Sequence, residues 1–89
     1  MSEPTISLLE FPCPFAIKAM GKMDVEFDLL VLELVGRHVT EISKDAIKLR
    51  PSKAGNYLAV TITITATSQQ QLDAIYQDLS GHPQVLMVL

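Results

Sequence analysis

The chain has 89 residues, 48% of them hydrophobic, and its seven basic and ten acidic side chains give a formal net charge of −3. This length indicates one domain, and the acidic balance argues against a general affinity for nucleic acid, which needs many cations to neutralise phosphates. One cysteine excludes an internal disulfide, and the sequence has neither a secretion signal nor a run of about 20 apolar residues. We therefore expect a cytoplasmic protein.

The amino-terminal residues 1–14 are expected to form a loosely packed arm, followed by a single folded domain over residues 15–89. Pro12 and Pro14 stiffen the entry into the domain, because each proline fixes its own φ and restricts the preceding residue. Apolar and other residues alternate from Phe15 to Met20, and this alternation predicts the first strand.

The first helix is predicted from Asp24, a suitable N-cap, to about Val39. Its core-facing stripe comprises Phe27, Leu30, Val31, Leu34, Val35 and His38. A second apolar stripe lies opposite and comprises Val25, Leu29, Leu32, Gly36 and Val39. A helix that is apolar on two sides is buried on both or offers a contact face. One expectation is that the second stripe contacts a partner protein or a second copy of the chain. The alternative is that the helix is rotated about its axis relative to the predicted core stripe, and that the amino-terminal arm covers the remaining apolar residues.

The second strand is predicted from Ala46 to Ser52, with Lys48 and Arg50 facing outward. This hairpin segment has a local charge of +3, from the four bases Lys44, Lys48, Arg50 and Lys53 and the acid Asp45. One interpretation is a patch for an anion or an acidic partner. The other is an edge strand whose outward cations prevent pairing with other sheets, and the expected edge position favours this second interpretation.

The strongest pattern of the chain is the third strand, predicted over Tyr57–Thr67. Apolar residues take every second position and threonines fill most of the positions between them. This is the period of a strand with one apolar face and one hydroxyl-lined face. We therefore expect a sheet that is covered on one side only.

A second helix is predicted to begin at Ser68, with Gln71 completing a capping-box pattern. Gly81 at the C′ position and Pro83 end this helix. The segment Val85–Leu89 is apolar on both faces and is expected to form the last strand at an edge of the sheet. That strand is expected either to add a partner's strand or to be shielded by the amino-terminal arm.

The predicted order is β-α-β-β-α-β, which places the chain in the α+β class with a ferredoxin-like fold. Both helices are expected on one face of an antiparallel sheet with strand order 4-1-3-2. The open face then carries Lys18 and the threonines of the third strand. RNA-binding sheets of this topology need aromatic residues on the central strands. The corresponding stretch offers only Tyr57, so RNA binding is disfavoured.

The candidate catalytic residues form no recognisable constellation. Cys13 lies between two prolines in an expected loop, where we interpret it as an inert thiol. His38 is expected at a helix end near terminal carbonyls, and His82 in a turn beside Gly81 and Pro83. No metal-binding motif and no glycine-rich phosphate loop is present. We therefore expect no enzymatic activity, cofactor or metal.

Three segments of the chain together carry a family resemblance: Leu8–Phe15, Lys53–Tyr57 and Val85–Leu89. They resemble the YbeD family of small uncharacterised bacterial proteins, over roughly the range from Leu8 to Leu89. The resemblance implies a ferredoxin-like fold similar to ACT-type regulatory domains and a bacterial cytosolic setting. It supplies no established activity, catalytic residue or cofactor. The genes of the family tend to lie near lipoate-transfer genes, which hints at a role in lipoate metabolism.

ACT-type domains bind small effectors at a glycine-bearing loop between the first strand and the first helix, across a dimer interface. The corresponding link in this chain is Met20–Asp24, so the resemblance places a candidate effector loop at Gly21 and Lys22. Fold analogy alone does not carry function.

The sequence thus predicts a non-enzymatic regulatory or protein-interaction module. Its candidate partner surface comprises Val25, Leu29, Leu32, Gly36, Lys48, Arg50 and Lys53. The alternative is an ACT-like homodimer that senses a small molecule near Gly21 and Lys22.

Overall fold

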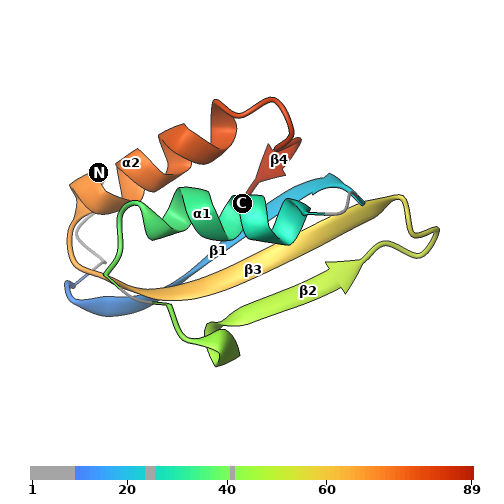
Figure 1. Cartoon of the computed structure of the whole chain (residues 1–89). Helices are drawn as coiled ribbons and strands as arrows, with labels where there is room; N and C mark the ends of the chain where they lie inside the picture. The colour runs from blue at the N-terminus through green and yellow to red at the C-terminus, as the bar shows by residue number, and fades with distance from the viewer. Residues whose placement is uncertain (1–9, 24–25, 41) are drawn as a thin grey trace, which may run out of the picture.

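The computed structural model describes residues 10–23, 26–40 and 42–89, and its elements follow the predicted order β-α-β-β-α-β. The elements are β1 Cys13–Lys22, α1 Phe27–Gly36, the 3-10 turn η2 Lys44–Ala46, β2 Ile47–Pro51, β3 Tyr57–Ala66, α2 Gln69–Ser80 and β4 Met87–Val88. Both helices pack on one face of the sheet, which confirms the ferredoxin-like, α+β arrangement (Figure 1). No helix in this described part of the chain is long and apolar enough to cross a membrane.

The four strands lie in the order β2-β3-β1-β4 and every neighbouring pair is antiparallel, as predicted. β1 and β3 form the centre of the sheet and pair along their full length. β2 is shorter, and its ladder with β3 runs only from Ile47 opposite Ile62 to Pro51 opposite Leu58. The end of β3 from Thr63 to Ala66 therefore extends beyond the strand that flanks it.

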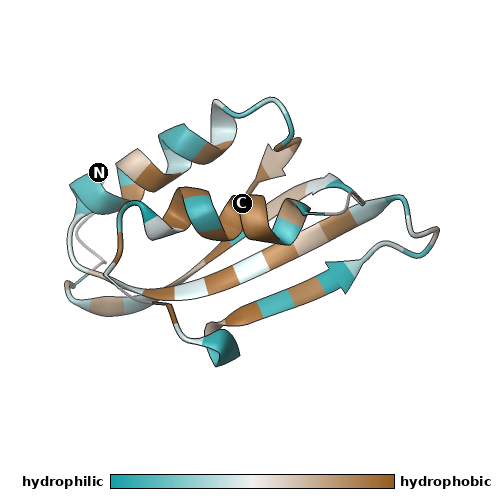
Figure 2. Cartoon of the chain, viewed as in Figure 1, coloured by the Kyte–Doolittle hydropathy of each residue, from teal (hydrophilic) through white to brown (hydrophobic). Residues whose placement is uncertain are grey.

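The single-layer core lies between the helices and one face of the sheet. The alternating residues of β3 are buried there as predicted, and buried residues of both helices belong to the same core. Figure 2 shows the alternating hydropathy along β3. The fully buried large side chains are Ile17, Val31, Val35, Val60, Ile62, Leu72, Ile75 and Leu79. Burial of each such side chain contributes about 1.5–3 kcal/mol. The threonines of β3 lie on the other face, which the helices leave open.

The edge strand β2 is not covered by the helix layer. Leu49 pairs with Val60 and shares its face of the sheet, yet Leu49 is 50% exposed whereas Val60 is fully buried. The reason is visible in Figure 1, where β2 extends away from both helices. The predicted edge position of the second strand is therefore confirmed.

Gly21 lies inside β1, because the strand continues to Lys22, beyond its predicted last residue Met20. Gly21 is also buried. A Cβ atom at this position would lie 2.5 Å from Cζ of Phe27 and 2.7 Å from the main-chain oxygen of Gln84. Glycine therefore lets the ring of Phe27 and the segment before β4 approach the strand closely.

The other element boundaries differ from the sequence predictions by a few residues. β1 begins at Cys13, two residues before the predicted start. α1 ends at Gly36 and not near Val39, since glycine and the β-branched residues that follow it are poor helix formers. The N-cap of α1 is Glu26 and not the predicted Asp24, so the helix begins later than predicted. Asp24 and residues 1–9 of the predicted arm lie outside the described residues.

The start of α2 confirms half of the predicted capping box. The hydroxyl oxygen of Ser68 accepts a hydrogen bond from the N–H of Gln71. The reciprocal bond differs, because Oε1 of Gln71 accepts from the N–H of Thr67, at 2.8 Å, and not from Ser68. Gly81 ends α2 as predicted, but with a right-handed φ of −83° and its N–H bonded to the oxygen of Gln77.

Candidate functional site

The open face of the sheet brings basic side chains of two strands together. Strand pairing creates two cross-strand rows on this face, Lys18–Thr61–Lys48 and Met20–Ala59–Arg50. Lys22 follows on the same face, opposite Tyr57. Side chains directly opposite each other in a sheet lie within contact distance. We call the set Lys18, Lys22, Lys48 and Arg50 the basic face.

No strand of the described chain contains an aspartate or glutamate. The described carboxylates lie in the helices and connecting segments: Glu10, Glu26, Asp28, Glu33, Asp45, Asp73 and Asp78. Among the described residues of α1, α2 and their flanks, only Arg37 adds a positive charge, and it pairs with Glu33 at 3.4 Å. The molecule therefore has a basic sheet surface and an acidic helix layer, which the net charge of −3 hides.

The β4 side of the open face is apolar. Met87 pairs with Met20, and Val88, the next residue, packs against the core on the opposite face. Leu89 exchanges main-chain hydrogen bonds with Lys18, so strand alternation directs Met87 and Leu89 to the open face. These two side chains are 51% and 62% exposed. The open face thus joins an apolar edge to the basic face.

The predicted partner surface is divided between the two sides of the sheet. Its helix residues lie in α1, on the covered face, whereas Lys48 and Arg50 lie on the open face and Lys53 in the turn after β2. Within α1, Leu29 is 55% exposed but Leu32 packs against the core.

The remaining members of the second helix stripe do not extend it into a continuous exposed face. Val39 is half-buried against the core, and Gly36 is exposed but has no side chain to offer a partner. Val25 lies outside the described residues.

The predicted effector loop is not a loop at Gly21 and Lys22, because these are the last two residues of β1, but it borders two small hollows. Gly21 is buried against Phe27, whereas Lys22 is exposed and contributes to both hollows. One has a volume of 240 Å³ and is lined by Lys22, Phe27, Pro83, Gln84 and Leu86. The other has a volume of 350 Å³ and is lined by Lys22, Met23, Gly55, Asn56 and Tyr57.

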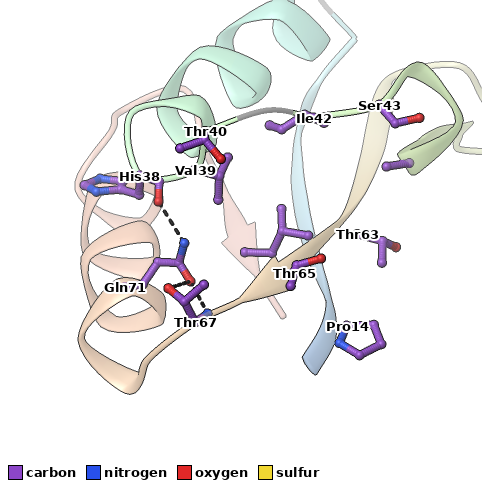
Figure 3. Close-up of a pocket in the computed structure, with 12 residues that line it drawn as sticks. Pro14, His38, Val39, Thr40, Ile42, Ser43, Thr63, Thr65, Thr67 and Gln71 are labelled. Atoms are coloured by element: carbon purple, nitrogen blue, oxygen red, sulfur yellow. Dashed lines mark hydrogen bonds between the residues drawn. The ribbon is translucent and has the colours of Figure 1, made fainter. Parts of the chain in front are cut away.

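A larger pocket of 620 Å³ lies at the opposite end of β1, where the sequence pattern predicts no site. We call it the edge pocket, because it borders the part of β3 that β2 leaves unpaired (Figure 3). Its lining comprises Pro14, His38, Val39, Thr40, Ile42, Ser43, Ala46, Thr63, Ile64, Thr65, Thr67 and Gln71. The volume is in the range of small-ligand sites, about 300–1,000 Å³.

Gln71 fixes one wall of the edge pocket. Its Nε2 donates to the main-chain oxygen of His38 at 2.8 Å, and its Oε1 accepts from both the N–H and the hydroxyl of Thr67 (Figure 3). The amide group thereby joins the end of α1, the end of β3 and the first turn of α2. The sequence pattern indicated a cap at Gln71 but gave no sign of the contact with His38.

The structure corrects two interpretations of single residues. Cys13 is the first residue of β1, opposite Ala66 and half-buried, and does not lie in a loop. The imidazole Nε2 of His38 lies 2.6 Å from Oδ2 of Asp78, so it meets a carboxylate of α2 and not helix carbonyls. The packing of α1 against α2 creates this contact, which sequence periodicity does not reveal.

Other polar groups have local roles. Nδ1 of His82 accepts from the N–H of Gln84 within the turn that was predicted there. The hydroxyl of Tyr76 donates to the main-chain oxygen of Leu89, and burial raises the pKa of this phenol. The described residues contain no group of three His, Cys, Asp or Glu side chains that could hold a metal ion.

Comparison with known proteins supports the family resemblance. The family model described as "Protein of unknown function (DUF493)" matches residues 6–89. A UPF0250 protein of Leptothrix cholodnii is 51% identical over 83 residues, which cover 93% of this chain and 91% of the relative. A UPF0250 protein of Paraburkholderia phytofirmans is 46% identical over 89 residues and the full length of both chains. The expected YbeD-type family is thus confirmed.

A solved structure has the same fold. The solution structure of protein HP0495 from H. pylori aligns with a TM-score of 0.74 and 15% sequence identity, over 98% of this chain and 88% of the other. At this identity the similarity establishes the architecture alone.

Proposed function

The chain belongs to the DUF493 family of proteins of unknown function, and from that premise we propose that it is a non-catalytic interaction module of the bacterial cytoplasm. Its ligand is an acidic, amphipathic segment of a partner protein, bound on the open face of the sheet. The observation that carries this proposal is the separation of charge: the basic face has four cations, and the described strands carry no acidic side chain.

The chemistry of the open face defines the partner. Carboxylates of the partner pair with Lys48 and Arg50 on the β2 side, and its apolar side chains cover Met87 and Leu89 on the β4 side. Each exposed ion pair contributes about 0.2–1 kcal/mol. Several pairs and a modest apolar area together predict a reversible complex that weakens as salt is raised.

The same face fits an acidic protein better than a nucleic acid. Stacking of bases requires aromatic side chains at the centre of the sheet, and the central strand β3 presents Ala59 and Thr61 there. A long polyanion that extended beyond the open face would also meet the acidic helix layer, which repels it.

A matched pair of charge reversals tests the proposal. A labelled peptide of alternating glutamate and leucine residues serves as the probe, and its affinity is measured by fluorescence anisotropy. We expect Arg50→Glu to weaken binding about two- to thirtyfold, because one attraction is lost and one repulsion is gained. Arg37→Glu makes the same change in the helix layer and is expected to leave the affinity unchanged.

Equal weakening by both substitutions would show that net charge alone governs binding, and the proposal would be wrong. An oligothymidine of the same charge is the second probe. Tighter binding of the oligothymidine than of the peptide would point to nucleic acid instead.

The alternative function is an ACT-like homodimeric sensor, linked to lipoate metabolism through the family resemblance. The two hollows beside Lys22 favour it. Binding to the native state alone raises the melting temperature. A rise with an amino acid, lipoate or a nucleotide that disappears in Lys22→Ala would support the sensor, and no rise at millimolar ligand would exclude these ligands.

A further inference from the structure

In the described part of the chain, no strand pairs with the outer side of the end of β3. In an antiparallel ladder, successive residues direct their N–H and C=O groups to opposite neighbours. The oxygen of Tyr57 accepts from the N–H of Ser52, after β2, so the odd-numbered residues of β3 face the β2 side. Thr65 is one of them, and it lies three residues beyond Ile62, where pairing with β2 ends.

The opposite strand agrees with this assignment. Lys18 and Met20 of β1 bond to the segment around β4, so the even-numbered residues of β1 face away from β3. Pro14 lies opposite Thr65, and this pair is one that exchanges no main-chain hydrogen bonds. Proline is tolerated at this position of β1 because no N–H is needed there for the pairing with β3. Among residues 10–23, 26–40 and 42–89, neither the N–H nor the C=O of Thr65 has a hydrogen-bond partner.

These main-chain groups, which have no partner among the described residues, border the edge pocket, whose described lining is nearly uncharged. His38 is the single ionisable residue in that lining, and the Nε2 of its imidazole is held by Asp78. Val39, Ile42 and Ile64 supply an apolar surface on the helix side of the strand. The hydroxyls of Thr63 and Thr65 lie on the other side. The site therefore combines a donor–acceptor pair at a strand edge with a neutral, partly apolar hollow.

We propose that the edge pocket binds an extended, uncharged peptide segment, which pairs with Thr65 as a short added strand. The main-chain N–H and C=O of one peptide residue bond to the C=O and N–H of Thr65. Strand alternation directs the side chain of this paired residue toward the threonine hydroxyls, and the side chains of its two neighbours over Val39, Ile42 and Ile64, where aliphatic residues fit. This site is separate from the basic face and does not depend on it.

The probe is a synthetic pentapeptide that is acetylated and amidated at its ends. In its sequence, valine alternates with serine or threonine. Binding is followed by ¹⁵N-HSQC titration of the full chain. We expect the amide of Thr65 to shift downfield and its hydrogen exchange to slow. The matched ligand is the same peptide N-methylated at its central residue, which keeps the side chains but removes the donor. We expect the protein to bind this N-methylated peptide about three- to tenfold more weakly than the unmodified peptide.

Two variants locate the site. Ile42→Glu introduces a carboxylate into the hollow and is expected to abolish the shift at Thr65, whereas Lys48→Glu on the basic face is expected to leave it unchanged. Equal affinity for the N-methylated peptide, or an unshifted Thr65 amide at millimolar peptide, would overturn the proposal. Loss of binding in Lys48→Glu together with retention in Ile42→Glu would assign the peptide to the basic face and would also overturn it.

Discussion

Gly21 shows how much a single position contributes to the packing of the fold. The position has no space for a side chain, since Phe27 and the main chain of Gln84 occupy it. We expect Gly21→Ala to lower the free energy of unfolding by about 1–3 kcal/mol, the usual cost of overpacking, as measured by urea denaturation.

Gly36→Ala is the matched control for this prediction. Gly36 lies at the end of α1, where an added Cβ would meet no atom within 4 Å. Alanine is expected to stabilise the protein there by up to about 1 kcal/mol, because it is the better helix former. A Gly21→Ala protein as stable as Gly36→Ala would contradict the close packing around Gly21.

Tyr76 gives a prediction on pH dependence. Burial raises the pKa of its hydroxyl above the ordinary value of 10.0. A raised folded-state pKa contributes stability that is fully present below the unfolded value and is lost as the pH rises through the folded one. Stability is therefore expected to fall as the pH rises above about 10.

The chain has two tyrosines, and Tyr57→Phe leaves Tyr76 as the one that absorbance at 295 nm follows. The titration of this variant is measured in the folded protein and again in concentrated urea. We expect the higher midpoint in the folded protein, and coincident midpoints would contradict the burial of Tyr76.

Among the elements, α2 is joined to the segment after α1 by the amide of Gln71, in addition to the contact between His38 and Asp78. Replacing Gln71 by alanine leaves the oxygen of His38 and the N–H of Thr67 without their partner. We expect Gln71→Ala to destabilise the fold by about 1–3 kcal/mol. Gln70→Ala, at the exposed neighbouring position, is expected to stay within about 0.5 kcal/mol of the wild type. Equal thermal stability of the two variants would argue against the bridging role.

The sequence allowed the elements to be predicted well where one face is buried and the other is not. The alternation along Tyr57–Ala66 gave the position, the face and the central place of β3. Predictions failed where tertiary contacts decide. β1 passes through Gly21, which pairs with Leu58 of β3 and lies against Phe27, and β4 keeps only Met87–Val88 of the predicted Val85–Leu89 strand.

The candidate sites were less predictable, because they depend on register and on helix packing. Lys48 and Arg50 were expected to face outward, but the alignment of Lys48 with Lys18 and of Arg50 with Met20 follows from the pairing through β3. The edge pocket exists because β2 starts late against β3, and a strand pattern does not give that offset. The contact between His38 and Asp78 likewise requires α1 and α2 to be packed together.

At the scale of the whole molecule, the two layers carry opposite charge. The net charge of −3 describes the chain only as a sum, because the described acids lie in the helices and loops and the strands hold Lys18, Lys22, Lys48 and Arg50. If an acidic partner binds as proposed, a potential of this shape orients it toward the sheet before contact. We therefore expect the partner to bind the sheet side of the molecule and not the helix side.

The most direct test is a ¹⁵N-HSQC titration of the wild-type chain with the peptide of alternating glutamate and leucine residues at low salt. We predict that the amides of Lys18, Lys48 and Thr61 shift together as the peptide is added, while those of α1 and α2 stay in place. Shifts that gather on α1 and α2, or no shifts at millimolar peptide, would contradict the assignment of the open sheet face as the binding surface.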